Sequence, residues 1–316
     1  MRPLASRLLD PFFPLAFGAP GFRLAARGFE PADLDVDLTG RVCLVTGANA
    51  GIGRATAEAL AARGATVHLL CRDRARGEEA RADIAARTRA PGAVVLDVVD
   101  VADRAALRAY VAERAPPRVD VLVHNAGVLP HERIETKDGF ELTYATNVLG
   151  PYLLTELLAP RLGRGARVVF VASGGALTQR LDLAVLTAER REVPFDGTVA
   201  YAQTKRAEII LAAELAETFR ARGVFVASMH PGWVDTRSLS TSLPRFYALT
   251  RALLRDASAG ADTVVWLAVS TRLGASESGR FFFDREAREP YPLFRTRESP
   301  ADREALLARL AHDARA

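Results

Sequence analysis

Residues 46–53, Thr-Gly-Ala-Asn-Ala-Gly-Ile-Gly, join a short β-rich run to a long alanine-rich run. A glycine-rich turn between a strand and a helix lets the backbone approach a pyrophosphate, which lies against the N–H groups and positive dipole end of the helix. The spacing here is Gly-x-x-x-Gly-x-Gly, not the Gly-x-Gly-x-x-Gly of other dinucleotide folds. The turn therefore predicts a dinucleotide site that opens an α/β domain. Its candidate cofactor-binding residues are Gly47, Asn49, Gly51, Ile52 and Gly53.

From residue 41 onward, short apolar runs rich in β-branched residues alternate with longer runs rich in Ala, Arg, Glu and Leu. This alternation predicts a single doubly wound α/β domain, a Rossmann fold with a parallel sheet of about seven strands covered by helices on both faces. The predicted strands are 42–46, 65–71, 93–98, 119–124, 166–172, 224–229 and 280–283. The predicted helices are 51–63, 77–89, 103–115, 139–162, 200–222, 258–270 and, in the tail, 299–313.

Three segments are expected along the chain: an N-terminal arm over 1–40, the dinucleotide-binding domain over 41–285, and a C-terminal extension with a helix over 286–316. The apolar run 8–17 of the arm contains two prolines and an aspartate. It is therefore too interrupted to span a bilayer and lacks the core of a signal peptide. We expect the arm to pack on the domain; an interfacial membrane contact or a partner-docking arm is the alternative.

The composition is that of a globular protein with a sizeable core, because 49% of the 316 residues are hydrophobic and 25% are charged. The net charge is +4, and basic residues are interspersed with acidic ones, which argues against a nucleic-acid partner. The chain has two cysteines in apolar runs and five histidines without ligand spacing. We therefore expect no metal site, no disulfide framework and a reducing, cytoplasmic location.

Tyr201 and Lys205 are four positions apart in a run that predicts a helix, so they lie on one helix face. Lysine is rare in this chain: of 42 basic residues, only Lys137 and Lys205 are lysines. A nearby ammonium favours a phenolate and moves the pKa of a tyrosine down from about 10, toward the range where a general acid or base works best. The pair is a candidate for proton transfer. An exposed helical pair without a role is the alternative.

Two long stretches without regular periodicity, 174–198 and 231–257, each follow a predicted strand. Open α/β sheets bind ligands at the carboxyl ends of their strands, and loops this long are usually functional or disordered. Segment 231–257 carries many apolar side chains, among them Trp233 and Phe246, which are candidate substrate-binding residues. We expect a lid that favours bulky apolar carbonyl compounds. The alternative is that these side chains pack a helix on the domain.

In their order along the chain, these motifs resemble those of the short-chain dehydrogenase/reductase family over residues 41–285. Residues 124–127, His-Asn-Ala-Gly, are similar to the Asn-Asn-Ala-Gly of the family, with His124 in place of the first asparagine. The 28 positions from Ser173 to Tyr201, and Thr-Lys-Asp-Gly-Phe-Glu at 136–141, look like the retinol-dehydrogenase side of the family. Ser-Met-His-Pro-Gly-Trp-Val-Asp-Thr at 228–236 further resembles its dehydrogenase/reductase member 12 branch.

The resemblance implies a role for each matching residue of the catalytic tetrad. Tyr201 would donate a proton to the substrate carbonyl oxygen in reduction, or remove one from the alcohol in oxidation. Lys205 would favour its phenolate form and bond the nicotinamide ribose, while Ser173 would hydrogen-bond the substrate oxygen. Asn147 would hold a water that links Lys205 to bulk solvent. The further implied cofactor-binding residues are Asp100 at the adenine, with Asp97 as a competing candidate, and Asn125, Ala126, Gly127, Pro231 and Gly232.

The end of the second predicted strand decides between NAD and NADP. A carboxylate there would bond the ribose hydroxyls of NAD, whereas an arginine accommodates the 2′-phosphate of NADP. The strand ends in Leu70-Cys71-Arg72 without an acid, and Arg54 adds positive charge nearby. We therefore expect NADP (NADPH), with Arg72 as a cofactor-binding residue. The alternative is that both arginines simply face water.

The sequence thus predicts an NADP(H)-dependent oxidoreductase, either a carbonyl reductase or an alcohol dehydrogenase, that acts on a small-molecule carbonyl or alcohol substrate. A catalytically idle NADP-binding protein with a regulatory or scaffolding role is the alternative. The intact set of Asn147, Ser173, Tyr201 and Lys205 argues against that alternative. By resemblance, we also expect a homo-oligomer paired through the helices at 139–162 and 200–222.

Overall fold

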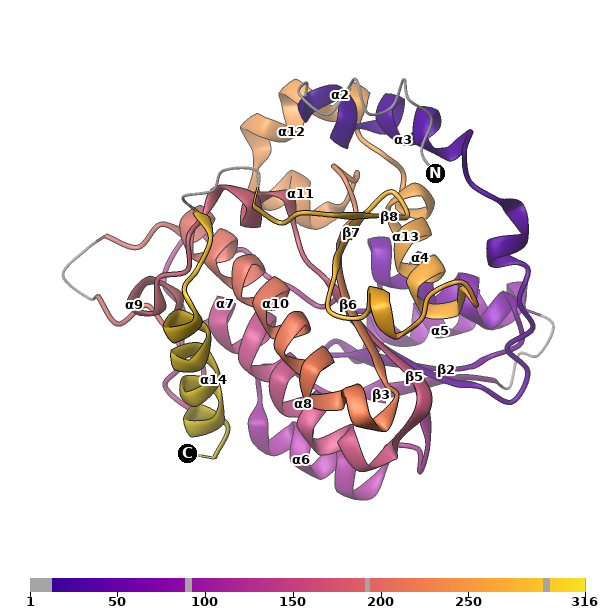
Figure 1. Ribbon diagram of the computed structural model, residues 1–316, viewed down its shortest axis with the longest axis horizontal. Helices are drawn as coiled ribbons and strands as arrows, with labels where there is room; N and C mark the ends of the chain where they lie inside the picture. The colour runs from indigo at the N-terminus through magenta and orange to yellow at the C-terminus, as the bar shows by residue number, and fades with distance from the viewer. Residues whose placement is uncertain (1–12, 89–92, 191–193, 292–295, 316) are drawn as a thin grey trace.

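An eight-stranded sheet forms the centre of the computed structural model, which describes residues 13–88, 93–190, 194–291 and 296–315 (Figure 1). The strand order is β3-β2-β1-β4-β5-β6-β7-β8, and all neighbours are parallel except β7 and β8. This is the doubly wound arrangement that the alternating sequence predicts. The strands are β1 (Val42–Thr46), β2 (Thr66–Cys71), β3 (Val94–Val98), β4 (Val119–His124), β5 (Leu162–Val171), β6 (Phe225–His230), β7 (Phe281–Phe283) and β8 (Glu286–Arg288).

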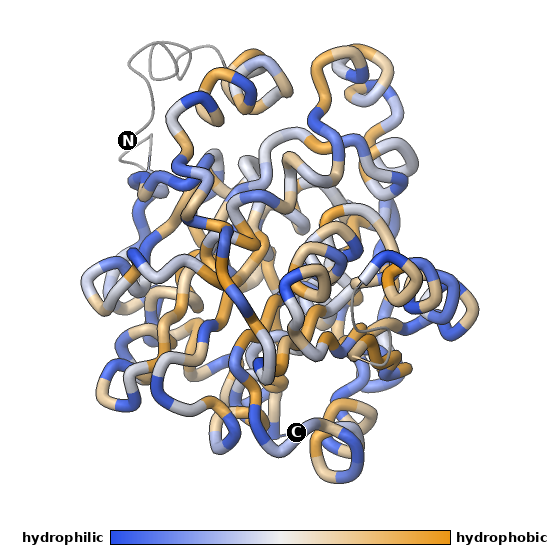
Figure 2. The backbone as a smooth tube through the Cα atoms, turned by 90° about the vertical axis from the view of Figure 1, so that its right-hand side faces the viewer, coloured by the Kyte–Doolittle hydropathy of each residue, from blue (hydrophilic) through white to orange (hydrophobic). Residues whose placement is uncertain are grey.

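Helices cover both faces of the sheet, which buries most residues of the central strands and explains their continuous apolar runs. Figure 2 shows the apolar segments gathered in the interior and hydrophilic segments at the periphery. One face packs against α4 (Gly51–Ala62), α5 (Arg74–Arg87) and α13 (Ala257–Val269). The other packs against α6 (Arg104–Glu113), α8 (Gly150–Leu158), α10 (Gly197–Phe219) and α14 (Pro300–Arg315).

Shorter helices lie in the connections, including the two long stretches 174–198 and 231–257. The short α-helices are α2 (Phe13–Phe17), α3 (Ala19–Ala26), α7 (Leu142–Tyr144), α9 (Leu183–Leu186), α11 (Arg237–Ser242) and α12 (Pro244–Thr250). The 3₁₀ helices are η1 (Pro31–Leu34), η4 (Ala159–Arg161), η5 (Gly174–Thr178), η6 (Arg220–Arg222), η7 (Arg251–Leu253) and η8 (Ala275–Glu277), and η3 (Ala145–Leu149) is a π-helical turn.

The chain switches direction of winding between β1 and β4, which are neighbours in the sheet. From β1 the chain continues to β2 and β3 on one side, and from β4 it continues to β5 and β6 on the other. Loops leave these two strands on opposite sides, so a crevice opens at their carboxyl ends. The glycine-rich turn 46–53 and the segment 125–127 both lie at this edge.

The single helix predicted over 139–162 is wrong at both ends and in its middle. The helix begins after Glu141, whose carboxylate accepts a hydrogen bond from the Tyr144 N–H at 2.9 Å. It then widens into the π-helical turn η3 around Asn147 before α8 begins. Leu162 already belongs to β5, paired with Val119. The apolar content of the run hid these breaks, because buried helix and buried strand share that composition.

The sheet has one strand more than the seven predicted. The antiparallel edge strand β8 follows β7 through Asp284 and Arg285, both with positive φ, +49° and +56°. A tight turn with two positive φ values suits the twist of a two-residue hairpin. A strand of three residues with two charged side chains gives no strand signal in the sequence. It lies beyond residue 285, where we expected the domain to end.

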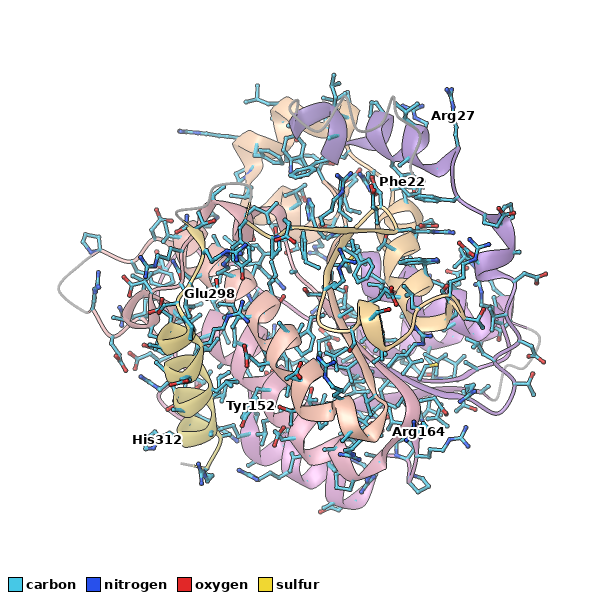
Figure 3. All side chains as sticks on the ribbon, viewed as in Figure 1. Phe22, Arg27, Tyr152, Arg164, Glu298 and His312 are labelled. Atoms are coloured by element: carbon cyan, nitrogen blue, oxygen red, sulfur yellow. The ribbon has the colours of Figure 1, made fainter. Side chains whose placement is uncertain are left out.

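The described part of the N-terminal arm lies against the domain. Phe22 of α3 points toward the sheet, and Arg27, which follows the helix, points outward (Figure 3). The Phe17 ring packs edge-on against His230 and Phe283, with ring centroids 4.6 and 5.1 Å apart. Residues 1–12, which include part of the apolar run 8–17, lie outside the described residues. None of the described helices is both long enough and apolar enough to cross a membrane.

Candidate active site

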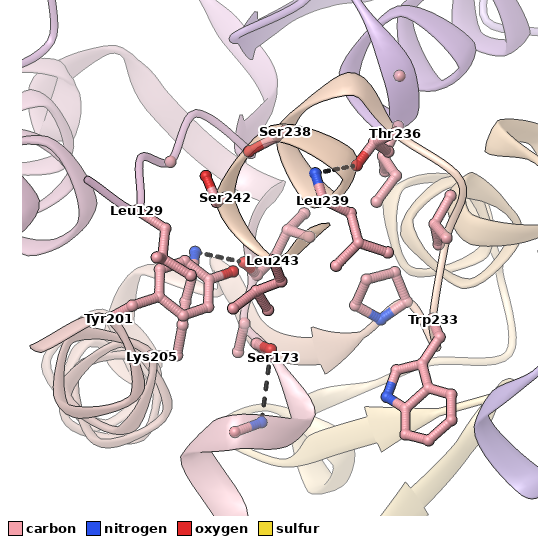
Figure 4. Close-up of a pocket in the computed structure, with 18 of the residues that line it drawn as sticks. Leu129, Ser173, Tyr201, Lys205, Trp233, Thr236, Ser238, Leu239, Ser242 and Leu243 are labelled. Carbon is pink, nitrogen blue, oxygen red and sulfur yellow. Dashed lines mark hydrogen bonds between the residues drawn. The ribbon is translucent and has the colours of Figure 1, made fainter. Parts of the chain in front are cut away.

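A cavity of about 430 Å³ opens at the carboxyl edge of the sheet. Its walls come from the turn after β1, the segment after β4, the start of η5, one face of α10 and the segment after β6 (Figure 4). The structure therefore brings together residues that lie up to 196 positions apart, from Ala50 to Phe246. The predicted site residues that line it are Gly51, Ile52, Asn125, Ala126, Gly127, Ser173, Tyr201, Lys205, Pro231, Gly232, Trp233 and Phe246.

The glycine-rich turn has the close backbone approach that a dinucleotide site requires. Gly47 and Gly51 have φ values of +66° and +53°, which favour glycine. A Cβ on Gly53 would lie 2.3 Å from Asn125 Nδ2 and 2.5 Å from the Gly47 carbonyl oxygen. The Ala50 N-cap of α4 supplies no side-chain hydrogen bond, so the first N–H groups of the helix remain available to an anion. These features fit a bound pyrophosphate.

Beneath this turn, Asn125 connects β4 to the end of β1. Its Nδ2 donates to the carbonyl oxygens of Thr46 and Gly47 at 2.9 and 3.3 Å, and its backbone N–H donates to Thr46 Oγ1 at 3.0 Å. These hydrogen bonds fix the shape of the turn. The predicted cofactor-binding residues Gly47, Asn49 and Gly53 belong to the turn but do not line the cavity.

The end of β2 carries Cys71 and Arg72 outside the cavity lining. Burial raises the pKa of the Cys71 thiol to about 11, although backbone N–H groups of Ala48 and Asn49 hydrogen-bond to its sulfur. Arg72 is 59% exposed, and its Nη1 lies 3.8 Å from Asp100 Oδ2. The guanidinium is therefore free to move toward a phosphate at this edge.

The two competing aspartates differ in position. Asp97 lies within β3, where its Oδ2 is 2.8 Å from His68 Nδ1 and 3.4 Å from the Tyr110 hydroxyl. Asp100 lies after the strand, at the carboxyl edge, and accepts a hydrogen bond from the Ala102 N–H. Asp97 is thus held within the sheet, whereas Asp100 lies at its carboxyl edge. Arg54 is paired with Asp83 at 2.6 Å, which balances the positive charge that we assigned to it.

Tyr201 and Lys205 lie one turn apart on α10 and line the same cavity as Ser173 (Figure 4). Helix α10 begins at Gly197 because Asp196 caps it, accepting hydrogen bonds from the N–H groups of Thr198 and Val199. The Lys205 ammonium is 5.5 Å from the centroid of the Tyr201 ring. Ser173 lies two residues after the end of β5, at the N-cap of η5. Its Oγ accepts a long hydrogen bond, 3.4 Å, from the Gly175 N–H.

Asn147 lies behind the cavity wall, in the π-helical turn η3, and is fully buried. Its Oδ1 accepts from the Val128 N–H at 2.9 Å, and its Nδ2 donates to Thr204 Oγ1 at 2.9 Å. A π turn in a helix often marks a functional site. Here it places the asparagine between the segment after β4 and the Tyr201 helix.

Lys205 has a partner that the sequence analysis missed. Its ammonium donates to Glu208 Oε1 at 2.7 Å and to the Val171 carbonyl oxygen at 2.9 Å. Burial lowers the pKa of Lys205, but Glu208 and Tyr201 outweigh burial, so the pKa lies above its usual value. A glutamate three residues after the lysine was the available signal.

Two histidines near the site are neutral. His124, which departs from the family motif, points its Nε2 to Thr155 Oγ1 at 2.7 Å, and burial lowers its pKa to about 3. His230 lines the cavity, and burial, assisted by Arg255, also lowers its pKa to about 3. Among the described residues, no group of three or more His, Cys, Asp or Glu side chains could hold a metal ion.

Helix α11 and the start of α12 lie over the cavity (Figure 4). The rings of Trp233 and Phe246 meet edge-to-face, with centroids 4.8 Å apart. The Phe17 ring of the arm also packs edge-to-face with Trp233, with centroids 6.0 Å apart. Leu249 is 86% exposed and is not a lining residue. The lining residues that we did not single out as site residues include Leu129, Thr198, His230, Thr236, Arg237, Ser238, Leu239, Ser242 and Leu243.

Comparison with known proteins agrees with this geometry. The family model described as short chain dehydrogenase matches residues 41–244. The human "Dehydrogenase/reductase SDR family member 12" is 42% identical over 291 residues, which cover 91% of this chain and 90% of that protein. Human "Retinol dehydrogenase 14" is 33% identical over 298 residues, which cover 87% and 86%.

Solved structures give the same result. The crystal structure of an uncharacterized protein from Mycobacterium paratuberculosis has a TM-score of 0.70 and 30% identity, and the match covers 91% of this chain and 97% of that chain. A short chain dehydrogenase from Burkholderia cenocepacia, crystallised in complex with NADP, has a TM-score of 0.62 and 30% identity, with 78% and 96% covered. The chain therefore belongs to the short-chain dehydrogenase/reductase family, near its retinol-dehydrogenase-like group.

Proposed function

We propose that the protein is an NADP(H)-dependent oxidoreductase that interconverts a carbonyl compound and its alcohol, with Tyr201 as general acid and base. One observation carries this proposal: Tyr201, Lys205 and Ser173 share one cavity with the glycine-rich turn. A proton donor, a cation that stabilises its conjugate base and a hydroxyl donor are thus gathered beside a dinucleotide cradle.

The role of each residue in the reaction follows from its position in the cavity. The nicotinamide, when bound, supplies or accepts the hydride. In reduction, the Tyr201 hydroxyl donates its proton to the substrate oxygen, and the Lys205 ammonium stabilises the phenolate that remains. The Ser173 hydroxyl donates a hydrogen bond to the same oxygen and stabilises the negative charge that develops on it. In oxidation, the phenolate removes the proton of the alcohol.

Three features support NADP over NAD. No acid stands at the end of β2, where a carboxylate would repel a 2′-phosphate. The exposed Arg72 guanidinium lies at this end, and its contact with Asp100 is loose, with 3.8 Å between Nη1 and Oδ2. The Burkholderia relative was crystallised with NADP.

The proposed substrate class is apolar. Leu129, Leu239, Leu243, Trp233 and Phe246 all line the cavity. Polar side chains of α11, including Ser238 and Ser242, also line it and give an apolar alcohol or carbonyl compound a small number of hydrogen-bonding groups. Retinol, after which the human relative retinol dehydrogenase 14 is named, belongs to the same apolar class of alcohols.

The deciding experiment is a screen of NADPH consumption over aldehydes and ketones graded by size and apolarity. Tyr201→Phe keeps the ring and removes the hydroxyl, so turnover should fall by about 10²–10⁴-fold while NADPH affinity changes little. Near-normal turnover in this variant would refute the acid–base role. NADPH binding without turnover of any carbonyl in the wild type would instead favour an idle NADP-binding protein.

We also propose that the chain works as a monomer, in place of the homo-oligomer expected from the resemblance. Helix α14 packs across the helices that we expected to pair: Leu306 and Leu310 are fully buried in one core with Tyr144 of α7 and Ile210 of α10. The Tyr144 hydroxyl donates to Asp313 of α14 at 2.8 Å. Part of the pairing face is therefore already covered.

A cytoplasmic location is likewise a proposal. It is supported by Cys43 and Cys71, which are buried, free thiols. Burial raises the pKa of Cys43 to about 12, so the thiol is unreactive, as suits a structural cysteine in a reducing compartment.

A further inference from the structure

Lys205 and Glu208 form an ion pair inside the protein, on the one helix that carries the proposed catalytic tyrosine. The ammonium is 2.7 Å from Glu208 Oε1, and both side chains are 3% exposed. Glu208 Oε2 has no hydrogen-bond partner among the described residues. Burial raises the pKa of the Glu208 carboxyl to about 7, and the Lys205 ammonium, its one described partner, opposes that rise and favours the carboxylate.

A buried pair of this kind is poor evidence for stability, because the loss of hydration offsets most of the attraction between the charges. An exposed counterpart on the same helix shows the difference. Glu217 and Arg220 are also three residues apart, but they are 66% and 65% exposed. The Lys205–Glu208 pair needs another explanation, and the place of Lys205 in the cavity wall offers one.

The surroundings of the ammonium leave Glu208 as its counter-charge. The groups that act electrostatically on Lys205 are Glu208 and Tyr201, both on α10. From the other elements around it, β5 offers the Val171 carbonyl oxygen, and η3 offers the neutral amide of Asn147 near Gly127. His230 of β6, in the same cavity, is held neutral by burial.

We infer that Glu208 is a positioning residue for the proposed reaction: its carboxylate keeps the Lys205 ammonium charged and fixed beneath Tyr201. The inference rests on the role proposed for Lys205. Without an opposite charge, burial would drive the ammonium toward the neutral amine. A neutral amine does not stabilise the phenolate that Tyr201 becomes when it gives up its proton. A buried carboxylate therefore maintains the positive charge with which Lys205 stabilises the phenolate.

The rarity of lysine makes this inference directly measurable. Protein labelled with ε-13C-lysine gives signals from two residues, and Lys137→Arg assigns them. In the wild type, we expect the Lys205 signal to keep its charged position beyond about pH 10, because Glu208 and Tyr201 hold its pKa above the ordinary lysine value of about 10.4. In Glu208→Gln, which has nearly the same shape, the signal should titrate at lower pH than in the wild type. The Lys137 signal, whose ammonium is paired with Asp103 at 2.6 Å, should not change.

Glu217→Gln is the matched control, because it removes a carboxylate from an exposed pair on the same helix. It should leave the Lys205 titration and the turnover unchanged. Glu208→Gln should reduce turnover by on the order of tenfold, and the alkaline fall in carbonyl reduction should move to lower pH, because Lys205 loses its charge earlier. Glu208→Asp retains the charge on a shorter side chain. Its turnover and its Lys205 titration should therefore lie between those of Glu208→Gln and those of the wild type.

The outcomes separate this inference from the proposed function. An unchanged Lys205 titration in folded Glu208→Gln overturns the inference, whatever the activity. A lowered titration with unchanged turnover and pH profile keeps the pairing but overturns the role of Lys205 in the reaction, and so its part of the proposed function. If Glu208→Gln does not fold, Glu208→Asp takes its place: its Lys205 should titrate below the wild type, and an unchanged titration overturns the inference.

Discussion

The Arg255 guanidinium and the Asp284 carboxylate form a two-point ion pair in the interior, with Nη1 2.5 Å from Oδ1 and Nη2 3.1 Å from Oδ2. Both side chains are 1% exposed. The same guanidinium donates to the carbonyl oxygens of Ala16 and Phe17 at 3.0 and 2.8 Å. One arginine therefore joins the N-terminal arm, the segment after β6 and the turn after β7.

Arg255→Leu should destabilise the protein strongly, because it removes the Arg255 cation from the buried Asp284 carboxylate and both guanidinium hydrogen bonds to the arm. The Phe17 carbonyl oxygen keeps the Trp233 N–H as a donor at 2.8 Å. Removing one partner of a buried pair lowers the free energy of unfolding by about 3–5 kcal/mol. Urea unfolding measures this change. Arg87→Leu is the control, since Arg87 is 61% exposed and its partner Glu58 lies 3.2 Å away. Its effect should stay within about 0.5 kcal/mol; equal effects of both substitutions would contradict the structural role of Arg255.

Cofactor preference should change in the double variant Cys71→Asp/Arg72→Ala. The Cys71 sulfur lies against the N–H groups of Ala48 and Asn49, so a carboxylate at this position would face the turn that cradles the cofactor. It would repel a 2′-phosphate, while the loss of Arg72 removes an attraction. The ratio of kcat/KM for NADPH to that for NADH should therefore fall. A ratio equal to that of the wild type would mean that the end of β2 does not select the cofactor.

The local motifs of the site could be predicted from the sequence because each needs only neighbours along the chain. The glycine-rich turn follows from the spacing of its glycines, and Tyr201 and Lys205 from the period of a helix. Ser173, Tyr201 and Lys205 do line one cavity with residues of the turn. The doubly wound sheet followed from the alternation of apolar and alanine-rich runs in the same way.

The long-range partners could not be predicted. Arg255 and Asp284 are separated by 29 positions, and nothing in either local sequence shows that they are buried together. Glu208 reads as an ordinary helical glutamate until the packing around α10 shows that it is buried. The edge strand β8 is too short for its pattern to show, and the π-helical turn around Asn147 depends on packing rather than on composition.

The intact chain should sediment as a monomer, near its mass of 34.1 kDa, because α14 occupies part of the face through which we first expected pairing. Removal of residues 299–316 would expose the apolar surface beneath Leu306 and Leu310. We expect that truncated protein to associate in a concentration-dependent way. Analytical ultracentrifugation distinguishes these states. A stable dimer of the intact chain would show that pairing uses a surface that α14 leaves open.

The apolar lid should decide which substrates bind well. Trp233 and Phe246 pack against each other over the cavity, and Leu249 on the same helix as Phe246 is 86% exposed. A buried aromatic side chain contributes roughly 1.5–3 kcal/mol, so Trp233→Ala or Phe246→Ala should raise KM for a bulky apolar carbonyl compound about tenfold or more. Leu249→Ala removes an apolar side chain from the same segment without touching the cavity and should leave KM unchanged.

Steady-state kinetics with a long-chain or polycyclic ketone and with a small polar aldehyde provide the comparison. The wild type should show the higher kcat/KM for the apolar compound, and the two lid variants should reduce this preference because they lose contact only with the larger molecule. Higher kcat/KM for the small polar aldehyde, or an effect of Leu249→Ala as large as that of Phe246→Ala, would mean that these aromatic side chains pack the lid helix on the domain and do not select the substrate.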